Sequence, residues 1–359
     1  MGKELIFYKG DYNNIMDYTV TDNGSIKRMK SPLASYLFDK RDGTMFTWGS
    51  SYSKEASRFP APTILDIEVT TICNGGCKFC YKSNTSTGRN MSFETFKHII
   101  DIFPQTLTQI AFGADANLTS NPDLWKMMRY VRKKGIVPNI TAAWFDEKTA
   151  DKLAKYCGAV ALSRYEHTKD KCYDSIKLLT DRDMEQVNMH FMLAEETYQQ
   201  CLETLDEIAT DDRLKYLNAF VILSLKTKGR GAGFHSCSQE HFNEIVKKAQ
   251  DLHIRLGFDS CSSAKALEAF CFDEALSKCV ISCEASRESS YINVDGEYYP
   301  CSFCEGEEGW EKGLSVLECN SEGDFVEKIW NNPRTLSFLD RLNATTDNHS
   351  CRHCPMFRV

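Results

Sequence analysis

The sequence predicts an α/β fold in which six strand–helix units build a mainly parallel sheet. Between residues 61 and 262, apolar runs of strand length alternate with segments whose apolar residues recur at helical spacing. Before this region the chain reads as short strands and turns, and after it cysteines become frequent. We therefore expect a β-rich lead-in over 1–60, the α/β unit over 61–262 and a cysteine-rich domain over 263–359.

The lead-in is expected to contain at least one β-hairpin. Residues 35–38 and 45–48 are strand-like and flank Asp42-Gly43, which favours a turn. Pro60-Ala61-Pro62 then interrupts regular structure and sets the predicted boundary.

Six strands and their intervening helices are expected in the central region. Ser92 is suited to cap one helix, and Gly135 to end another. The predicted strands are 64–69, 107–112, 137–143, 159–163, 186–193 and 217–225, followed by an edge strand over 255–261.

Strand alternation predicts which polar side chains face the interior of this unit. Asp66 and Glu68 share one face of the first strand, and Asn188 and His190 share one face of the fifth. Such residues are either ligands in a cavity or hydrogen-bonded core residues, and His190 is our candidate for a catalytic role. In the same way, alternation over 255–261 places Asp259 and Cys261 together. Both are catalytic candidates, and Cys261 is alternatively a ligand of the auxiliary iron or a buried packing residue.

Composition restricts the function classes. The net charge of −7 argues against an extended binding interface with duplex nucleic acid. No apolar run reaches the roughly 18 residues that a membrane span needs. Sixteen cysteines in a chain of 359 residues, which we expect to be cytoplasmic, favour metal or redox chemistry over disulfides.

The most informative motif is a loop that contains three cysteines directly after the first strand. Cys73, Cys77 and Cys80 lie within eight residues, and Phe79 precedes the third. Three thiolates leave one iron of a four-iron cluster without a protein ligand, so that this iron can bind another molecule. A zinc knuckle or a chance cluster is the alternative interpretation.

The spacing Cys73-x3-Cys77-x2-Cys80 after an apolar strand resembles the signature of the radical S-adenosylmethionine (SAM) superfamily. The resemblance implies a partial (β/α)6 barrel, a [4Fe–4S] cluster whose open iron binds SAM, and an electron donor such as flavodoxin or ferredoxin. We expect Phe79 to lie beside the cluster, and Asn188 on the fifth strand to contact the cofactor.

Two further strand ends resemble SAM-binding positions of that superfamily. Gly113-Ala114-Asp115 occupies the place of a Gly-Gly-Glu-Pro stretch, although Asp115 replaces the glutamate and no proline follows. Ser163 and Arg164 resemble the position that contacts the SAM carboxylate or ribose, or are ordinary polar residues at a strand end. A glycine-rich basic loop over 226–233 is either an anion contact or a flexible connection.

The C-terminal cysteines predict a second metal site. Cys283-x12-Gly296-x4-Cys301 followed by Cys351-x2-Cys354 resembles the twitch module, a short form of the SPASM domain, and implies one auxiliary [4Fe–4S] cluster. A zinc ribbon built from Cys301-x2-Cys304 and Cys351-x2-Cys354 is the rival interpretation. The remaining cysteines, including Cys304 and Cys319, are otherwise expected to be packing residues, although either of these two is an open possibility as an auxiliary ligand.

These patterns predict a radical SAM enzyme that abstracts hydrogen from its substrate. A peptide or protein side chain is the first expectation for the substrate, and a small molecule or nucleotide is the second. A non-catalytic zinc- or cluster-binding interaction protein is the hypothesis from another class.

Overall fold

The computed structural model describes residues 6–7, 18–51, 58–271, 273, 275, 280, 283–343 and 354. Its N-terminal part is an antiparallel meander, as expected for the lead-in. The five strands follow chain order in the sheet: β1 (Ile6–Phe7), β2 (Thr19–Asp22), β3 (Ile26–Lys30), β4 (Ser35–Asp39) and β5 (Met45–Trp48). The predicted hairpin is confirmed, with Ser35 opposite Trp48 and Phe38 opposite Met45.

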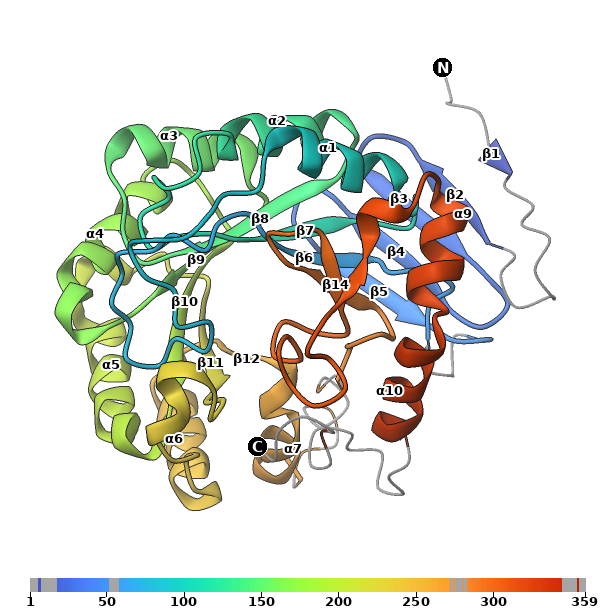
Figure 1. Cartoon of the computed structure of the whole chain (residues 1–359). Helices are drawn as coiled ribbons and strands as arrows, with labels where there is room; N and C mark the ends of the chain where they lie inside the picture. The colour runs from blue at the N-terminus through green and yellow to red at the C-terminus, as the bar shows by residue number, and fades with distance from the viewer. Residues whose placement is uncertain are drawn as a thin grey trace.

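The central region is a parallel sheet in which neighbouring strands are consecutive along the chain. All six predicted strands and the predicted edge strand form, although the edge strand is shorter than expected. They are β6 (Ile64–Glu68), β7 (Gln109–Gly113), β8 (Val137–Ala142), β9 (Val160–Ser163), β10 (Val187–Leu193), β11 (Ala219–Ser224) and β12 (Leu256–Phe258). Figure 1 shows the sheet curving as an open barrel with helices on its outer side.

The helices that cover the sheet bury apolar faces against it. Ser92 caps the first helix by accepting from the backbone N–H of Thr95, and Gly135, with a φ of +76°, follows the second. The helices are α1 (Phe93–Ile102), α2 (Leu124–Lys133), α3 (Glu147–Tyr156), α4 (Lys169–Thr180), α5 (Tyr198–Thr210), α6 (Gln239–Asp251) and α7 (Ser263–Ala269). Among the described residues, no helix is long and apolar enough to cross a membrane.

The C-terminal region extends the main sheet. Strand β13 (Ser289–Ile292) pairs in parallel with β6 and then turns into β14 (Glu297–Tyr299), which pairs with β15 (Leu314–Ser315). The predicted hairpin around Asp295-Gly296 is confirmed, but its addition to the edge of the barrel was not anticipated. The short helix α9 (Glu322–Phe325) and helix α10 (Pro333–Asn343) complete the described part of this region.

One sequence expectation about the edge strand is wrong. Strand β12 ends at Phe258, and Ser260–Ser262 form a turn of 3-10 helix. The turn forms because the Asp259 carboxylate accepts from the backbone N–H of Ser262 and so caps it. Strand alternation therefore cannot place Asp259 and Cys261 on one face.

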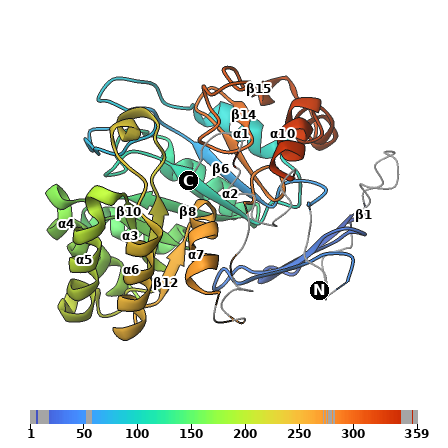
Figure 2. The same cartoon turned by 90° about the horizontal axis from the view of Figure 1, so that it is seen from below.

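The N-terminal sheet and the C-terminal elements lie on the same side of the barrel, beside β6, whereas α4, α5 and α6 lie on the other side (Figure 2). Buried contacts join the N-terminal sheet to the barrel. The ammonium of Lys27 donates to the carbonyl of Leu107, and the hydroxyl of Tyr36 donates to the carbonyl of Thr106 at 2.7 Å. The domain boundaries at 60 and 262 stay predictions.

Candidate functional site: two cysteine segments joined by a basic loop

The loop with three cysteines begins just after β6, at the carboxyl edge of the sheet. Its backbone is held by hydrogen bonds from Cys73 N–H to Thr85 O at 2.6 Å and from Cys80 N–H to Cys77 O at 3.3 Å. A Cβ at Gly75 would lie 2.8 Å from the Cβ of Ala116 and within 3.5 Å of the sulfurs of Cys73 and Cys77. A glycine is therefore needed where this loop passes between the two thiols and the loop after β7.

The electrostatics of the three thiols fit a positively charged metal centre. Burial raises the pKa of the Cys77 thiol, and the nearby thiols of Cys73 and Cys80 raise it further, while a hydrogen bond from Tyr165 opposes the rise. Clustered thiolates repel one another unless a cation lies among them. The donor set, three cysteines on a tight loop, suits a cluster held by three thiolates.

The glycine-rich basic loop is a clamp on this cysteine loop. The guanidinium of Arg230 donates from Nε to Cys77 O at 2.8 Å and from an Nη to Asn84 O at 3.0 Å, while its backbone N–H donates to Cys80 O. Gly229 has a φ of +56°, and a Cβ there would lie 2.4 Å from the carbonyl oxygen of Tyr81. The glycines are thus explained by close approach of two backbones, which the sequence interpretation did not foresee.

The same basic loop also contacts the C-terminal cysteine segment. Lys228 donates to the carbonyls of Phe303 and Glu305, and Nζ of Lys226 lies 4.9 Å from the centre of the Phe303 ring. The rings of Tyr81 and Phe303 meet directly, with their centres 4.6 Å apart. Because Tyr81 follows Cys80 and Phe303 precedes Cys304, the two cysteine segments are in side-chain contact. We refer to residues 226–234 as the bridging loop.

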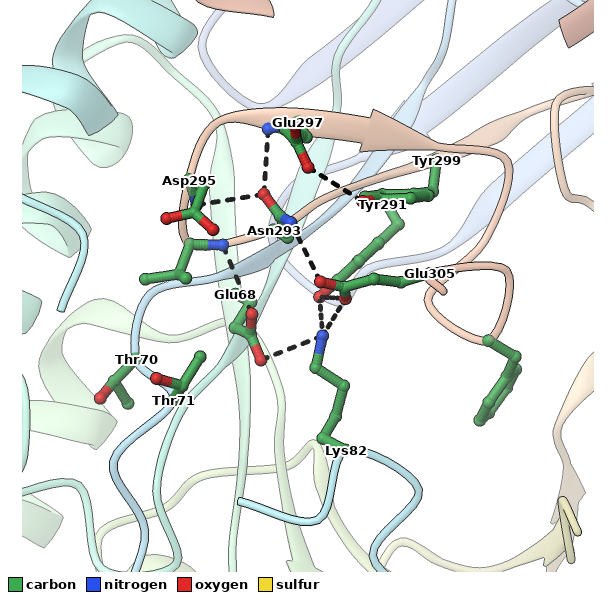
Figure 3. Close-up of polar contacts among 12 residues, drawn as sticks. Glu68, Thr70, Thr71, Lys82, Tyr291, Asn293, Asp295, Glu297, Tyr299 and Glu305 are labelled. Carbon is green, nitrogen blue, oxygen red and sulfur yellow. Dashed lines mark hydrogen bonds and ion pairs between the residues drawn. The ribbon is translucent and has the colours of Figure 1, made fainter. Parts of the chain in front are cut away.

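A buried ionic network beside this contact joins the segments a second time (Figure 3). Lys82 lies between Glu68 and Glu305: its ammonium is 3.3 Å from the Glu68 carboxylate, is also paired with Glu305, and donates to the Tyr291 hydroxyl at 2.8 Å. Burial raises the pKa of Glu68. At Glu305, burial is opposed by the charge of Lys82 and by hydrogen bonds from Lys82, Asn293 and Tyr291, which together lower its pKa. One ammonium therefore stabilises two partly or fully buried carboxylates from different parts of the chain.

Among the predicted SAM-binding residues, Asp115 orders its own loop. The two carboxylate oxygens of buried Asp115 accept from the backbone N–H groups of Thr119 and Ser120 at 3.0 and 3.2 Å. The carbonyl of Gly113 accepts from Val69 N–H, and Ala114 is half-buried beside it. The structure thus places this stretch next to the start of the cysteine loop, and its role toward SAM stays a prediction.

The segment after β9 contacts the cysteine loop through residues that the sequence interpretation missed. Tyr165 is hydrogen-bonded to both Cys77 and Ser163, and Nε2 of His167 lies 3.1 Å from Gly75 O. Arg164 is buried and instead pairs with Glu166 at 2.6 Å, on the same turn. The only available signal was that these residues follow a predicted strand end, where binding residues collect.

Phe79 and Asn188, two other predicted cofactor-binding residues, each contact a side chain from another segment. The ring of Phe79 packs on Phe234 of the bridging loop, with their centres 4.4 Å apart. Asn188 accepts from the side chain of Asn218 at 2.8 Å, near the start of β10. It therefore lies at the amino end of its strand, whereas the cysteine loop lies at the carboxyl edge of the sheet.

The three predicted catalytic residues lie near one another together with a buried lysine. Nζ of Lys226 is 3.5 Å from the Asp259 carboxylate and is hydrogen-bonded to the Cys261 thiol. Burial lowers the pKa of His190 to about 4, and the nearby Asp259 charge opposes this shift. His190 is therefore neutral at pH 7. The missed member is Lys226, which the sequence placed only at a strand end.

The auxiliary cysteines are partly described. The sulfurs of Cys301 and Cys304 are 3.4 Å apart, while Cys283 and Cys354 are both half-buried. Cys351 lies outside the described residues. The proximity of Cys304 to Cys301 makes it a fifth possible ligand, so the choice between the predicted set and the zinc ribbon stays open.

The fold and the C-terminal region together define a class: an open α/β barrel with a parallel sheet, followed by a cysteine-rich domain. Residues 283–355 match the family model of the SPASM iron–sulfur cluster-binding domain, so the expectation of such a domain is confirmed. No curated protein matches the chain at the sequence level.

Among solved structures, the chain is similar to SuiB of Streptococcus suis. The structure of SuiB bound to the precursor peptide SuiA superposes with a TM-score of 0.68 at 12% identity, covering 95% of this chain and 94% of SuiB. SuiB bound to S-adenosylmethionine gives a TM-score of 0.58 at 15% identity over 84% of this chain and 72% of that one. The predicted fold class is thus confirmed.

Proposed function

We propose that this protein is a radical SAM enzyme that modifies a side chain of a peptide or protein. The observation that carries the proposal is the convergence of Cys73, Cys77 and Cys80 at the carboxyl edge of the barrel, clamped by the bridging loop beside a SPASM domain. Three thiolates suit a four-iron cluster with one open iron, as the fold class would require. We further propose one auxiliary cluster and an external electron donor of the flavodoxin or ferredoxin type.

The protein supplies orientation around the cofactor. When bound, the cluster and SAM would supply a 5′-deoxyadenosyl radical that takes a hydrogen atom from the substrate. We assign contacts with SAM to Phe79, to the stretch Gly113–Asp115 and to Ser163 with Arg164. Tyr165 and Arg230 hold the cysteine loop in place through Cys77.

We assign substrate contacts to His190, Asp259 and Cys261. Lys226 fixes the Asp259 carboxylate and the Cys261 thiol at the carboxyl ends of β11 and β12, where chemistry occurs in barrels of this kind. Neutral His190 can accept or donate a hydrogen bond without adding charge.

A peptide substrate is supported by the similarity to SuiB, whose structure with a precursor peptide covers nearly all of this chain. The auxiliary segment lies close to the proposed substrate contacts, because Nζ of Lys226 is 4.9 Å from the centre of the Phe303 ring.

The decisive experiment is reductive cleavage of SAM. Reconstituted protein with dithionite and SAM should yield 5′-deoxyadenosine and methionine in equal amounts, Cys77→Ala should yield none, and Cys271→Ala should behave as wild type because Cys271 is exposed. Absence of 5′-deoxyadenosine from protein with intact clusters would overturn the proposal. A deuterated peptide digest tests the substrate class, because a peptide substrate transfers deuterium to 5′-deoxyadenosine.

A further inference from the structure

A second group of metal-ligating side chains lies away from both cysteine segments. Glu195 follows β10, Cys237 precedes α6 and His241 lies in its first turn; one ligand atom from each lies within 4.8 Å of the other two. The Cys237 side chain is buried at 4% exposure, whereas Glu195 and His241 are partly exposed. The group is therefore buried at Cys237 and accessible to solvent at Glu195 and His241.

The histidine is held in an orientation that suits a metal better than a hydrogen bond. Its ring stacks on Tyr198, with centres 3.8 Å apart and planes 11° apart. Nδ1 is buried and lies 2.7 Å from Oε1 of Glu195, yet in the part of the chain that the structure describes it has no hydrogen bond of acceptable angle. A buried ring nitrogen without such a bond calls for another partner.

The glutamate is also fixed, but only through one oxygen. Oε2 of Glu195 accepts from the backbone N–H of Ser238 at 2.9 Å, which leaves Oε1 directed at His241. The carboxylate is therefore oriented by the same helix start that carries the other two side chains. Orientation of ligands by neighbouring hydrogen bonds is typical of metal sites.

We propose that Glu195 Oε1, the Cys237 thiolate and His241 Nδ1 bind one zinc ion, with water in the fourth position on the open side. Thiolate and imidazole ligands select zinc over magnesium or calcium, which prefer oxygen. Bond lengths of about 2.0–2.3 Å would place ligand atoms about 3.3–3.8 Å apart, so the Glu195–His241 pair opens slightly on binding.

Such a zinc ion would stabilise the bridging loop. Cys237 lies three residues after Phe234, whose ring packs on Phe79 of the cysteine loop. The metal would join this end of the bridging loop to the connection after β10. It would thus act as a structural support for the clamp on Cys77, without taking part in the reaction.

Zinc and iron analysis of the purified full-length protein tests the site. After growth with added zinc, we expect one more zinc per chain in wild type than in Cys237→Ala, His241→Gln or Glu195→Gln, with iron content unchanged. The matched controls are His235→Gln and Cys271→Ser, both at exposed side chains outside the group, and they should retain the zinc. Zinc held at the C-terminal cysteines would be common to all variants and cancels in the difference.

A zinc chelator should also lower the melting temperature of wild type and of the two controls, but not that of the three site variants. Equal zinc in wild type and the site variants would overturn the proposal, as would a chelator effect that is the same in all proteins. Glu195→Gln is the informative variant if a core substitution impairs folding, because Gln keeps the bond to Ser238 and weakens only the ligand. Failure of SAM cleavage would leave this result untouched, since neither measurement depends on it.

Discussion

The two cysteine segments differ in how their ligands are brought together. Cys73, Cys77 and Cys80 lie on one tight loop whose geometry depends on local hydrogen bonds and on Gly75. The predicted auxiliary ligands extend from Cys283 to Cys354, on both sides of the hairpin whose first strand pairs with β6. We therefore expect local sequence to set the first site and tertiary folding to set the second.

The bridging loop makes the two sites dependent on each other despite this difference. Arg230 contacts the carbonyl of Cys77, and two residues earlier Lys228 contacts the carbonyls of Phe303 and Glu305. We therefore expect a change in either cysteine segment to affect the other through these backbone carbonyls. The following predictions separate local from transmitted effects.

The largest effect is expected at the local site. Replacing Cys77 with Ala should abolish 5′-deoxyadenosine formation and reduce iron from about eight to about four per chain, because one loop holds one cluster of four irons. Iron analysis and chromatography of the products measure both quantities. Loss of all iron would show instead that the auxiliary site depends on an assembled first site.

The auxiliary segment should give a partial effect. We expect Cys301→Ser to remove about four irons while SAM cleavage without substrate persists. Cys304→Ser decides between the ligand sets: unchanged iron supports Cys283, Cys301, Cys351 and Cys354, whereas an equal loss makes Cys304 a ligand. A wild-type protein that contains zinc and only about four irons per chain would favour the zinc ribbon.

The difference between the sites also explains what the sequence could predict. Strands β6 to β11 follow from apolar runs, and the cysteine loop follows from its spacing, since both depend on neighbours along the chain. The pairing of β13 with β6, the roles of Lys82 and Tyr165, and the contact between Tyr81 and Phe303 depend on residues far apart in sequence. The early end of β12 was missed because a capping carboxylate, Asp259, competed with the strand pattern.

A stability effect is expected at the ionic network between the segments. Lys82→Met leaves the buried carboxylate of Glu68 and the half-buried carboxylate of Glu305 without their cation, which should lower the free energy of unfolding by about 3 kcal/mol. The matched control is Lys177→Met, which removes an exposed pair with Asp181 and should cost less than about 1 kcal/mol. Urea denaturation under anaerobic conditions measures both. Equal effects would show that the network contributes no more than a surface pair.

Restoring the charge balance should recover part of this loss. In Lys82→Met with Glu68→Gln, one of the two uncompensated carboxylates is removed, so the double variant should be more stable than Lys82→Met alone. A double variant that is less stable than either single variant would mean that Glu68 has partners that matter more than Lys82.

The smallest expected effect concerns His190 in the barrel interior, where the pH dependence of stability reports burial. Its pKa is about 4 in the folded protein because burial disfavours the imidazolium, and about 6.5 in the unfolded chain. Between these values the unfolded chain binds the extra proton, so protonation destabilises the fold as the pH decreases from about 6.5 to 4. When the pH is lowered from 6 to 5, the wild type should therefore lose about 1 kcal/mol more unfolding free energy than His190→Gln. Urea denaturation at both pH values measures this difference. The wild-type protein, measured in the same buffers, gives the reference pH dependence. If His190→Gln shows the same dependence, the imidazole is hydrated enough to ionise in the folded state, and a neutral His190 would no longer support the proposed substrate contact.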